Sequence, residues 1–330
     1  MKKNMKQISF FFKNQLITAF FCSLIAVSTA IIAHPEPHLQ QPKFDTPVFE
    51  PLEKPCNVVI IIPAYNEESR IEKTLSAYFD YFNKLKNVSA TFLVVCNNCS
   101  DNTVGICRDT QSHCSNLHYL NLKPGGKGFA VKQGFLKALE FQDTDFIGFV
   151  DADMATAPDY FYELITKIKK HDGIIASRYK NGARVWPNRP FIKKIGGKFY
   201  NWVLRQNFHL DVRDTQCGAK LFSYETVATV APHMKETGWA FDLELLYLCQ
   251  LFDKDIIEIP TTWVDKPGSH LAISSCYKEF ISAPLRIKKE HKKLAGKLSR
   301  EKSNAKAAAR KQARLERQHH HHNPQFMASK

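Results

Sequence analysis

The chain has 330 residues, a net charge of +14 and 44% hydrophobic residues. This composition is ample for one sizeable core and gives no sign of a second catalytic domain. Nine cysteines, an odd number without a regular framework, indicate reduced thiols and argue against a disulfide-stabilised secreted domain.

The N-terminal region contains one long apolar segment. Residues 16–33 carry no charge over 18 positions and follow four lysines. That length just spans a bilayer, so we expect residues 1–33 to form a membrane anchor. A cleaved signal peptide is the alternative, because residues 28–30 are small and offer a cleavage site. Residues 34–56 are rich in proline and polar residues and are expected to form a linker.

Apolar runs of strand length then alternate with segments whose apolar residues recur at helical spacing. We expect strands over residues 57–62, 91–95, 118–122, 146–150 and 174–177, and helices over residues 71–82 and 129–139. This alternation predicts βαβ units, and hence an α/β fold with a mostly parallel sheet flanked by helices.

A polar motif follows each of the first four expected strands. In chain order the motifs are Pro63-Ala64-Tyr65-Asn66-Glu67, Asn97-Asn98-Cys99-Ser100-Asp101-Asn102-Thr103, Gly125-Gly126-Lys127-Gly128 and Asp151-Ala152-Asp153. In a parallel sheet the carboxyl ends of the strands share one edge, and ligands bind there. The four motifs are therefore expected to converge on one site.

The last of these motifs carries the chemistry. Asp151 and Asp153 follow an apolar strand at positions i and i+2, so both carboxylates can face one hard divalent cation. Mg²⁺ or Mn²⁺ takes oxygen ligands and is commonly shared with substrate phosphates. Such a metal neutralises the charge that develops on a departing diphosphate. The alternative interpretation is an ordinary surface loop, in which Asp is common.

Four cysteines lie in or near the second motif, at positions 96, 99, 107 and 114. The first two have the Cys-x-x-Cys spacing of a zinc site, but the second two are separated by six residues and fall on and after an expected helix. We favour small buried thiols over a zinc site.

The order of these motifs resembles that of the family 2 glycosyltransferases of the GT-A fold. The second half of the chain resembles the dolichyl-phosphate glucosyltransferases, with dolichyl-phosphate mannose synthases as near relatives. The residues that carry this resemblance are Asp214-Thr215-Gln216-Cys217-Gly218-Ala219-Lys220-Leu221-Phe222, Trp239-Ala240-Phe241-Asp242-Leu243-Glu244-Leu245-Leu246, Ile259-Pro260, Trp263 and Gly268-Ser269-His270-Leu271. The resemblance implies a GT-A domain over residues 57–272. It also implies inverting transfer of a hexose, glucose from UDP-glucose, to a polyprenyl or dolichyl phosphate.

The same resemblance implies the residues that bind the nucleotide sugar. They are Pro63, Ala64, Tyr65, Glu67, Asn97, Asn98, Lys127, Asp151, Ala152, Asp153, Gln216 and His270. Asn97 and Asn98 stand where the family usually has Asp, and His270 stands where it commonly has Lys. Asparagine still accepts a hydrogen bond from uracil or ribose but supplies no charge. Histidine at pH 7 neutralises a diphosphate less completely than lysine does.

Several of these residues also have a purely structural interpretation. Pro63 to Glu67 suits a strand-to-helix turn, and Asp101 suits a helix N-cap. The glycines around Lys127 suit a turn, although glycine backbone at a helix N-terminus also suits phosphate binding. Asp242 suits the cap of an expected helix over residues 243–251.

A phosphate-ester acceptor needs cations, and arginine suits bidentate contact with phosphate. The resemblance supports Arg178, which follows the strand at 174–177, in this role, and then Arg189. Lys193 is a further candidate, and contact with lipid headgroups is its alternative role. The acceptor is already an anion near neutral pH, so no strong base is needed. We therefore expect Asp242 to orient the acceptor or the sugar. The expected catalytic set is Asp151, Asp153, Asp242 and Arg178.

The C-terminal region, residues 273–330, is expected to be amphipathic and then basic. Residues 288–318 hold twelve Lys and Arg against three Glu. A solvated, partly disordered tail is one interpretation, and attraction to anionic lipid headgroups is the other. Nucleic acid is not favoured as a partner, because no aromatic or base-reading motif accompanies the charge.

The membrane topology is predicted from the chemistry of the substrates and thiols rather than from the N-terminal lysines. The N-terminal lysines favour placing the catalytic domain across the membrane from the cytosol. Nucleotide sugars and reduced thiols belong to the cytosol, so we expect a membrane-anchored protein whose catalytic domain faces the cytosol.

Two other classes of function stay open. One is a family 2 transferase that acts on a hydroxyl of a glycolipid, glycan or protein, with Asp242 as base, or a mannose synthase. The other is a degenerate, non-enzymatic domain that binds membrane or nucleic acid.

Overall fold

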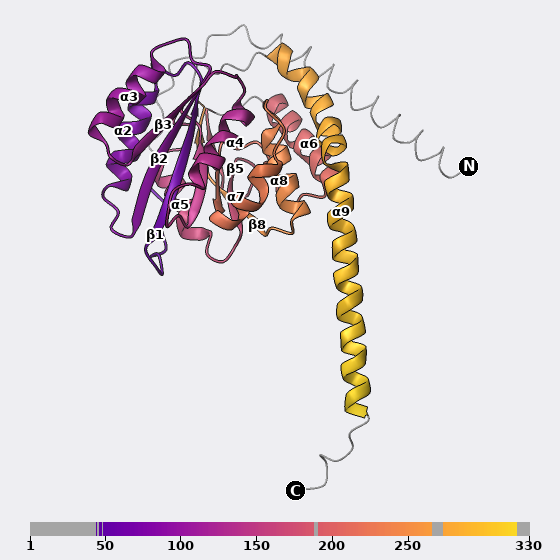
Figure 1. The fold of residues 1–330 in the computed structure, drawn as a ribbon. Coiled ribbons are helices and arrows are strands. Elements are labelled where there is room, and N and C mark those ends of the chain that lie inside the picture. Colours follow the sequence, from indigo (N-terminus) through magenta and orange to yellow (C-terminus); the bar gives the residue numbers. More distant parts are fainter. Residues whose placement is uncertain (1–43, 45, 48, 188–190, 266–272, 322–330) are drawn as a thin grey trace. The chain divides into compact units, whose positions relative to one another are not determined.

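The computed structural model describes residue 44 and residues 46–47, 49–187, 191–265 and 273–321 (Figure 1). The expected anchor over residues 1–33 lies outside the described residues, as does most of the expected linker. Among the helices that are described, none is both long and apolar enough to cross a bilayer. The chain has two compact units, Met1–Pro284 and Leu285–Lys330, and we describe each by itself.

The first half of the chain alternates strands and helices as the sequence predicts. The elements are β1 (Cys56–Ala64), α2 (Ile71–Phe82), β2 (Val88–Asn97), α3 (Thr103–His113), β3 (Leu117–Leu122), α4 (Lys127–Ala138) and β4 (Phe146–Val150). Each expected strand is present within this half, and β1 and β2 extend further than their apolar runs. Helix α4 begins at Lys127 itself, two residues before the expected start.

The second half is less regular. It contains α5 (Pro158–Lys167), β5 (Gly173–Ser177), β6 (Arg184–Trp186), α6 (Phe191–Phe208), β7 (Ala219–Ser223), α7 (Tyr224–Val230), the 3-10 turn η1 (Ala231–His233), α8 (Phe241–Leu251), β8 (Ile256–Pro260), β9 (Thr262–Val264) and α9 (Ile273–His321). Strands β6 and β9 pair in parallel as a small second sheet.

The main sheet has seven strands in the order β3-β2-β1-β4-β7-β5-β8. All neighbouring pairs are parallel except those of β7, which runs antiparallel between β4 and β5. The mostly parallel sheet predicted from the sequence is therefore confirmed. The strand order reverses direction between β1 and β4, which places the ends of these two strands at a topological switch point.

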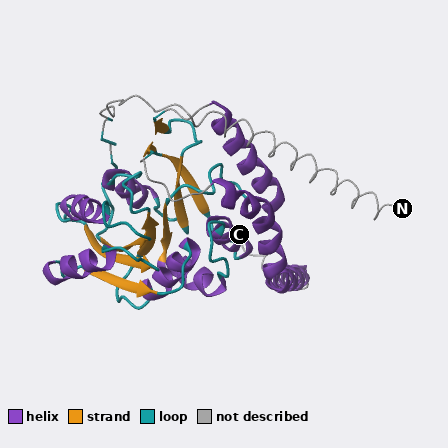
Figure 2. Cartoon of the chain, turned by 90° about the horizontal axis from the view of Figure 1, so that it is seen from above, coloured by secondary structure: helices purple, strands orange, loops and turns teal. Residues whose placement is uncertain are grey.

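Helices cover both faces of this sheet (Figure 2). On one face, Ile60 and Ile62 of β1 belong to the buried cluster that includes Leu75 and Tyr78 of α2. On the other face, Ile61 contacts α4 at Gly134, where an added Cβ would clash with the Ile61 side chain. Because alternate residues of β1 point to opposite faces, its continuous apolar run is what a strand buried on both sides requires.

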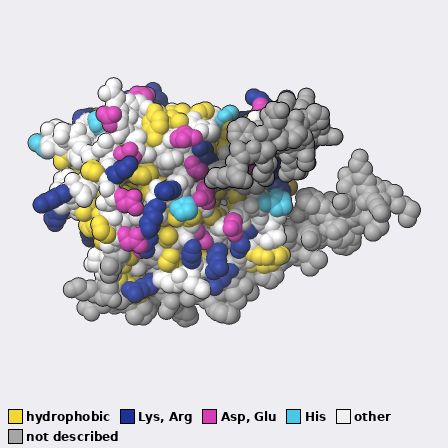
Figure 3. All heavy atoms as spheres, turned by 90° about the horizontal axis from the view of Figure 1, so that it is seen from below, with side chains coloured by type: hydrophobic (Ala, Val, Ile, Leu, Met, Phe, Trp, Pro, Cys, Tyr) yellow, Lys and Arg dark blue, Asp and Glu magenta, His cyan; other side chains and the backbone are white. Residues whose placement is uncertain are grey.

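The second unit consists of the C-terminal part of α9. Its exposed residues include Lys292, Lys293 and Lys297. Helix α9 continues through this region to His321. The face of the molecule seen in Figure 3 carries interspersed basic and acidic side chains rather than a patch of one sign.

Candidate functional site

Two carboxylates stand at the end of β4, at the switch point of the sheet. The backbone N–H of Asp151 donates to the carbonyl oxygen of Gly218 at 3.2 Å. A Cβ built at Gly218 would overlap the Asp151 carboxylate, so only glycine allows this approach. Asp153 accepts a hydrogen bond from the N–H of Ala155 at 2.9 Å. Burial and the neighbouring charge of Asp151 raise the pKa of Asp153.

Helix α2 holds the loop that carries these carboxylates. The Thr74 hydroxyl donates to the carbonyl oxygen of Ala152 at 2.7 Å, and the Tyr78 hydroxyl donates to that of Thr156 at 3.0 Å. The two donors are four residues apart, so they lie on one face of the helix. The buried face of α2 thus fixes the loop on both sides of Asp153.

Lys127 lies against the first carboxylate. Its Nζ is 2.5 Å from Asp151 Oδ1, and the two side chains are 19% and 21% exposed. Burial alone would lower the pKa of the Lys127 ammonium, but the carboxylates of Asp151 and Asp242 outweigh burial and raise it. The indole of Trp239, which is 38% exposed, has its ring centroid 5.4 Å from the same ammonium.

The glycines around Lys127 serve loop packing. The N–H groups of Gly128 and Phe129 donate to the carbonyl oxygens of Gly238 and Thr237, each at 3.2 Å. Gly126 has φ of 128°, and a Cβ there would clash with the Thr237 carbonyl oxygen. These amides at the start of α4 are therefore engaged by the loop before α8. Phosphate binding by this motif stays a prediction, and Lys127 is the part of the motif that faces the carboxylates.

Asp242 belongs to a buried ion pair. Its Oδ1 accepts a hydrogen bond from Lys220 Nζ at 2.6 Å, and the same ammonium donates to the carbonyl oxygen of Cys217 at 2.7 Å. Lys220 is fully buried. Burial raises the pKa of Asp242, and the charges of Lys220 and Lys127 offset part of that rise. The N-cap of α8 is Ala240, so Asp242 is not the cap of this helix.

The charges of four residues alternate in sign in the order Asp151, Lys127, Asp242, Lys220. We call these four residues the charge chain. Sequence reasoning found three of them and missed Lys220. The signal was available, because a lysine within the apolar strand Ala219–Ser223 must find a buried counter-ion.

The end of β2 lies beside the glycine loop. Asn97 Nδ2 donates to the carbonyl oxygen of Gly126 at 2.6 Å, while Asn97 Oδ1 is buried without a hydrogen-bond partner in the described part of the chain. Asn98 follows with φ of 57°, a left-handed conformation that asparagine tolerates. The end of β2 therefore contains one buried acceptor without a partner among the described residues.

The loop after β1 is partly structural. Pro63 and Ala64 are the last residues of β1, and Tyr65 is 46% exposed. The Glu67 carboxylate accepts from Arg70 Nε at 2.6 Å and Nη2 at 2.8 Å.

Asp101, whose capping role was left open, accepts hydrogen bonds from the N–H and hydroxyl of Thr103. These bonds satisfy the start of α3 as a cap would.

Arg178 is also engaged within the protein. Its Nε and Nη2 donate to the two carboxylate oxygens of Asp214 at 2.8 and 2.9 Å, and its guanidinium stands 5.2 Å from the Trp263 ring centroid. Asp214 also accepts from the N–H of Gln216 at 3.3 Å, which ties this pair to the turn beside Asp151. Direct contact of Arg178 with an acceptor phosphate stays a prediction. Arg189 and His270, and the side chain of Lys193, lie outside the described residues.

The donor set at the carboxylates fits a metal that is shared with a ligand. In the residues that the structure describes, no group of three or more His, Cys, Asp or Glu side chains is placed to hold a metal. Asp151 and Asp153 supply carboxylate oxygens only, which suits Mg²⁺ or Mn²⁺ completed by phosphate and water oxygens.

Comparisons with known proteins agree with this geometry. The sequence pattern described as Glycosyl transferase family 2 matches residues 59–227. A dolichyl-phosphate beta-glucosyltransferase of Trichomonas vaginalis is 32% identical over 243 residues, which cover 70% of this chain and 70% of the relative. A dolichyl-phosphate beta-glucosyltransferase of Dictyostelium discoideum is 30% identical over 233 residues, covering 64% of this chain and 68% of the relative.

Among solved structures, the chain is similar to glucosyl-3-phosphoglycerate synthase from Mycobacterium tuberculosis. In its complex with Mn²⁺, uridine diphosphate and glucosyl-3-phosphoglycerate, that enzyme aligns with a TM-score of 0.50 and 14% identity, over 70% of this chain and 78% of that one. At this level of identity the likeness shows a common fold.

The buried pair within the charge chain gives a testable stability difference. Lys220→Met is expected to lower the free energy of unfolding by about 3–5 kcal/mol, because Asp242 would stay buried without its counter-ion. The double variant Lys220→Met/Asp242→Asn should recover most of this loss, since neither charge remains. Chemical denaturation of the full chain measures both. Lys137→Met, which removes a lysine from an exposed pair with Glu140, is the control. A loss at Lys220 no larger than at Lys137 would contradict the assignment.

Proposed function

We propose that this chain transfers glucose from UDP-glucose to a polyprenyl phosphate. The proposal starts from the family: the chain belongs to glycosyl transferase family 2 and is a glycosyltransferase. The observation that carries the proposal is the pair of carboxylates at the switch point of the sheet, with Lys127 beside them. The relatives named as dolichyl-phosphate beta-glucosyltransferases support dolichyl phosphate, or a related polyprenyl phosphate, as the acceptor.

The donor end of the site favours a base with an N–H on its pairing edge. Asn97 Nδ2 already donates to Gly126, which leaves Oδ1 as a buried acceptor without a partner among the described residues. Uracil presents such an N–H at N3 and guanine presents one at N1, whereas the corresponding ring nitrogen of cytosine is itself an acceptor, so this contact favours UDP or GDP over CDP. The amide in place of a carboxylate keeps this contact but adds no charge.

A divalent metal is part of the proposal. Asp151 and Asp153 would hold Mg²⁺ or Mn²⁺, which supplies neutralisation of the charge on the departing diphosphate. Lys127 adds a second cation on the same side, and the turn at Gly218 keeps Asp151 in place. Most of the rate enhancement would then come from positioning and electrostatics.

The acceptor attacks the anomeric carbon from the face opposite the diphosphate, which inverts the configuration. A phosphate monoester is an anion near neutral pH and needs no base. The ion pair between Asp242 and Lys220 supports an orienting role for Asp242. A hydroxyl acceptor is the competing possibility, and the raised pKa of Asp242 is the observation that favours it, because a base must be able to take up a proton.

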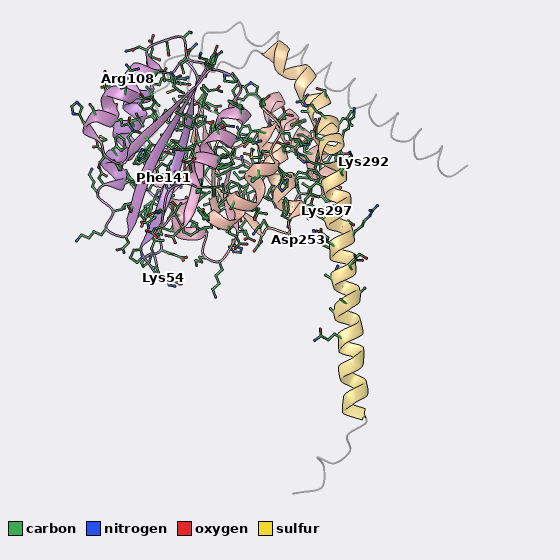
Figure 4. All side chains as sticks on the ribbon, in the orientation of Figure 1. Lys54, Arg108, Phe141, Asp253, Lys292 and Lys297 are labelled. Carbon is green, nitrogen blue, oxygen red and sulfur yellow. The ribbon has the colours of Figure 1, made fainter. Side chains whose placement is uncertain are left out.

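Membrane attachment with the catalytic domain facing the cytosol is also proposed. In the C-terminal unit, Lys292, Lys293 and Lys297 are exposed on α9, and Figure 4 labels two of them. Basic residues near an anionic bilayer each contribute about 1 kcal/mol of attraction. We propose that α9 lies on anionic lipid and brings the site to its lipid substrate.

The transfer itself is tested with three donors in parallel. The full chain, with a polyprenyl phosphate and Mn²⁺, is expected to give an organic-soluble, acid-labile product from radiolabelled UDP-glucose. GDP-mannose and UDP-N-acetylglucosamine are the other donors. Product from GDP-mannose alone would move the protein to the mannose synthases. If UDP binds but no donor yields a lipid product, the polyprenyl-phosphate proposal fails.

The metal assignment is tested by removing each carboxylate. Asp151→Ala and Asp153→Ala are each expected to lower turnover at least about a hundredfold, because each removes a group that stabilises the transition-state charge. Asp109→Ala, an exposed position on α3, is the matched control and should keep normal turnover. Near-normal turnover of the unmodified protein in EDTA would contradict the metal while leaving transfer intact.

The role of α9 is tested by neutralising its exposed charges within the full chain. Changing Lys292, Lys293, Lys297 and Lys306 to Gln should weaken binding to phosphatidylserine vesicles by about fivefold for each charge that contacts the surface. The control variant changes four exposed lysines of the first unit, Lys54, Lys73, Lys84 and Lys86. Vesicle sedimentation at low and high salt measures both. Equal loss in the two variants would show that α9 has no special role.

A further inference from the structure

The D-A-D carboxylates already hold a cation that belongs to the protein. Lys127 Nζ lies 2.5 Å from Asp151 Oδ1, on one of the two residues assigned to the metal. Both side chains are about one-fifth exposed, so solvent and ions reach the pair. A divalent ion that binds Asp151 must therefore meet the charge of Lys127.

Asp151 and Lys127 differ in how far each can move from the other. The backbone of Asp151 is held by its N–H bond to Gly218, and the Asp151 carboxylate lies close to that glycine. Lys127 is the first residue of α4, and its long side chain has other favourable surroundings within reach. The Asp242 carboxylate attracts it, and the Trp239 and Phe241 ring centroids lie 5.4 and 6.0 Å from its ammonium. The lysine can leave Asp151 without becoming an isolated buried charge.

We propose that Lys127 is a resident cation of the donor site, which opposes binding of a divalent metal alone and favours binding of a diphosphate alone. The inference rests on the donor site of the proposed function and adds to it an order of events. The diphosphate would bind first or together with the metal, because its negative charge compensates Lys127 and makes room for the second cation.

The physical reason is that the positive charge of Lys127 has opposite effects on the binding of the two ligands. A positive charge a few ångströms from Asp151 repels Mn²⁺ and attracts the diphosphate of UDP. Removing that charge should then strengthen the binding of Mn²⁺ and weaken the binding of UDP. If Lys127 only maintained local structure, its removal would weaken the binding of both ligands.

The experiment compares Lys127→Met with the unmodified full chain in two separate titrations. Mn²⁺ without nucleotide, followed by electron paramagnetic resonance, is expected to bind about tenfold tighter or more to the variant. UDP in EDTA, followed by calorimetry, is expected to bind about tenfold weaker or more. Lys132→Met is the matched control, because Lys132 lies on the same helix and donates to the Met234 carbonyl oxygen. It should change neither affinity.

A double variant tests whether the gain in Mn²⁺ affinity depends on Asp151. Adding Asp151→Asn to Lys127→Met should abolish the gain in Mn²⁺ affinity, because the gain acts through that carboxylate. Weaker binding of both ligands to Lys127→Met, or an unchanged Mn²⁺ affinity, would overturn the inference. Neither titration depends on transfer. Opposite shifts without any glycosylated lipid would therefore overturn the proposed function and leave this inference standing.

Discussion

Four alternating charges at the carboxyl edge of the sheet form the constraint on which the site depends. Lys127 lies next to Asp151 and Lys220 lies next to Asp242, so each carboxylate in this largely buried place has a cation beside it. Lys220 also holds the Cys217 carbonyl, one residue before the glycine that packs against Asp151. The position of the Asp151 carboxylate and the environment of Asp242 are therefore set by the same few contacts.

The scaffold explains why these charges meet. Strands β4 and β7 are antiparallel neighbours, so the residue after β4 and the turn before β7 lie side by side. Helix α4 starts at the same edge, and the loop that precedes α8 packs on its first turn through backbone carbonyls. Helix α2 fixes the loop after β4 from the opposite face of the sheet. The site thus lies at the carboxyl end of β4, which is the usual place in open α/β sheets.

Much of this was predictable from local pattern. The strands and the first helices follow from apolar periodicity, and the edge on which the motifs converge follows from parallel topology. The pairing of Lys220 with Asp242 joins residues 22 positions apart and depends on side-chain packing, which periodicity does not encode. The hydrogen bonds from the amides of Gly128 and Phe129 to the loop before α8 depend on tertiary packing in the same way. The bidentate bond of Arg178 to Asp214 was likewise not visible in a motif.

The central claim is that the charge chain forms the diphosphate end of a donor site. A crystal structure of the full chain with Mn²⁺ and UDP tests it most directly. The account predicts the metal between Asp151, Asp153 and the diphosphate, the Lys127 ammonium moved away from Asp151, and the uracil edge at Asn97. Nucleotide bound away from β4, or bound there with Lys127 still on Asp151 and no metal present, would contradict it.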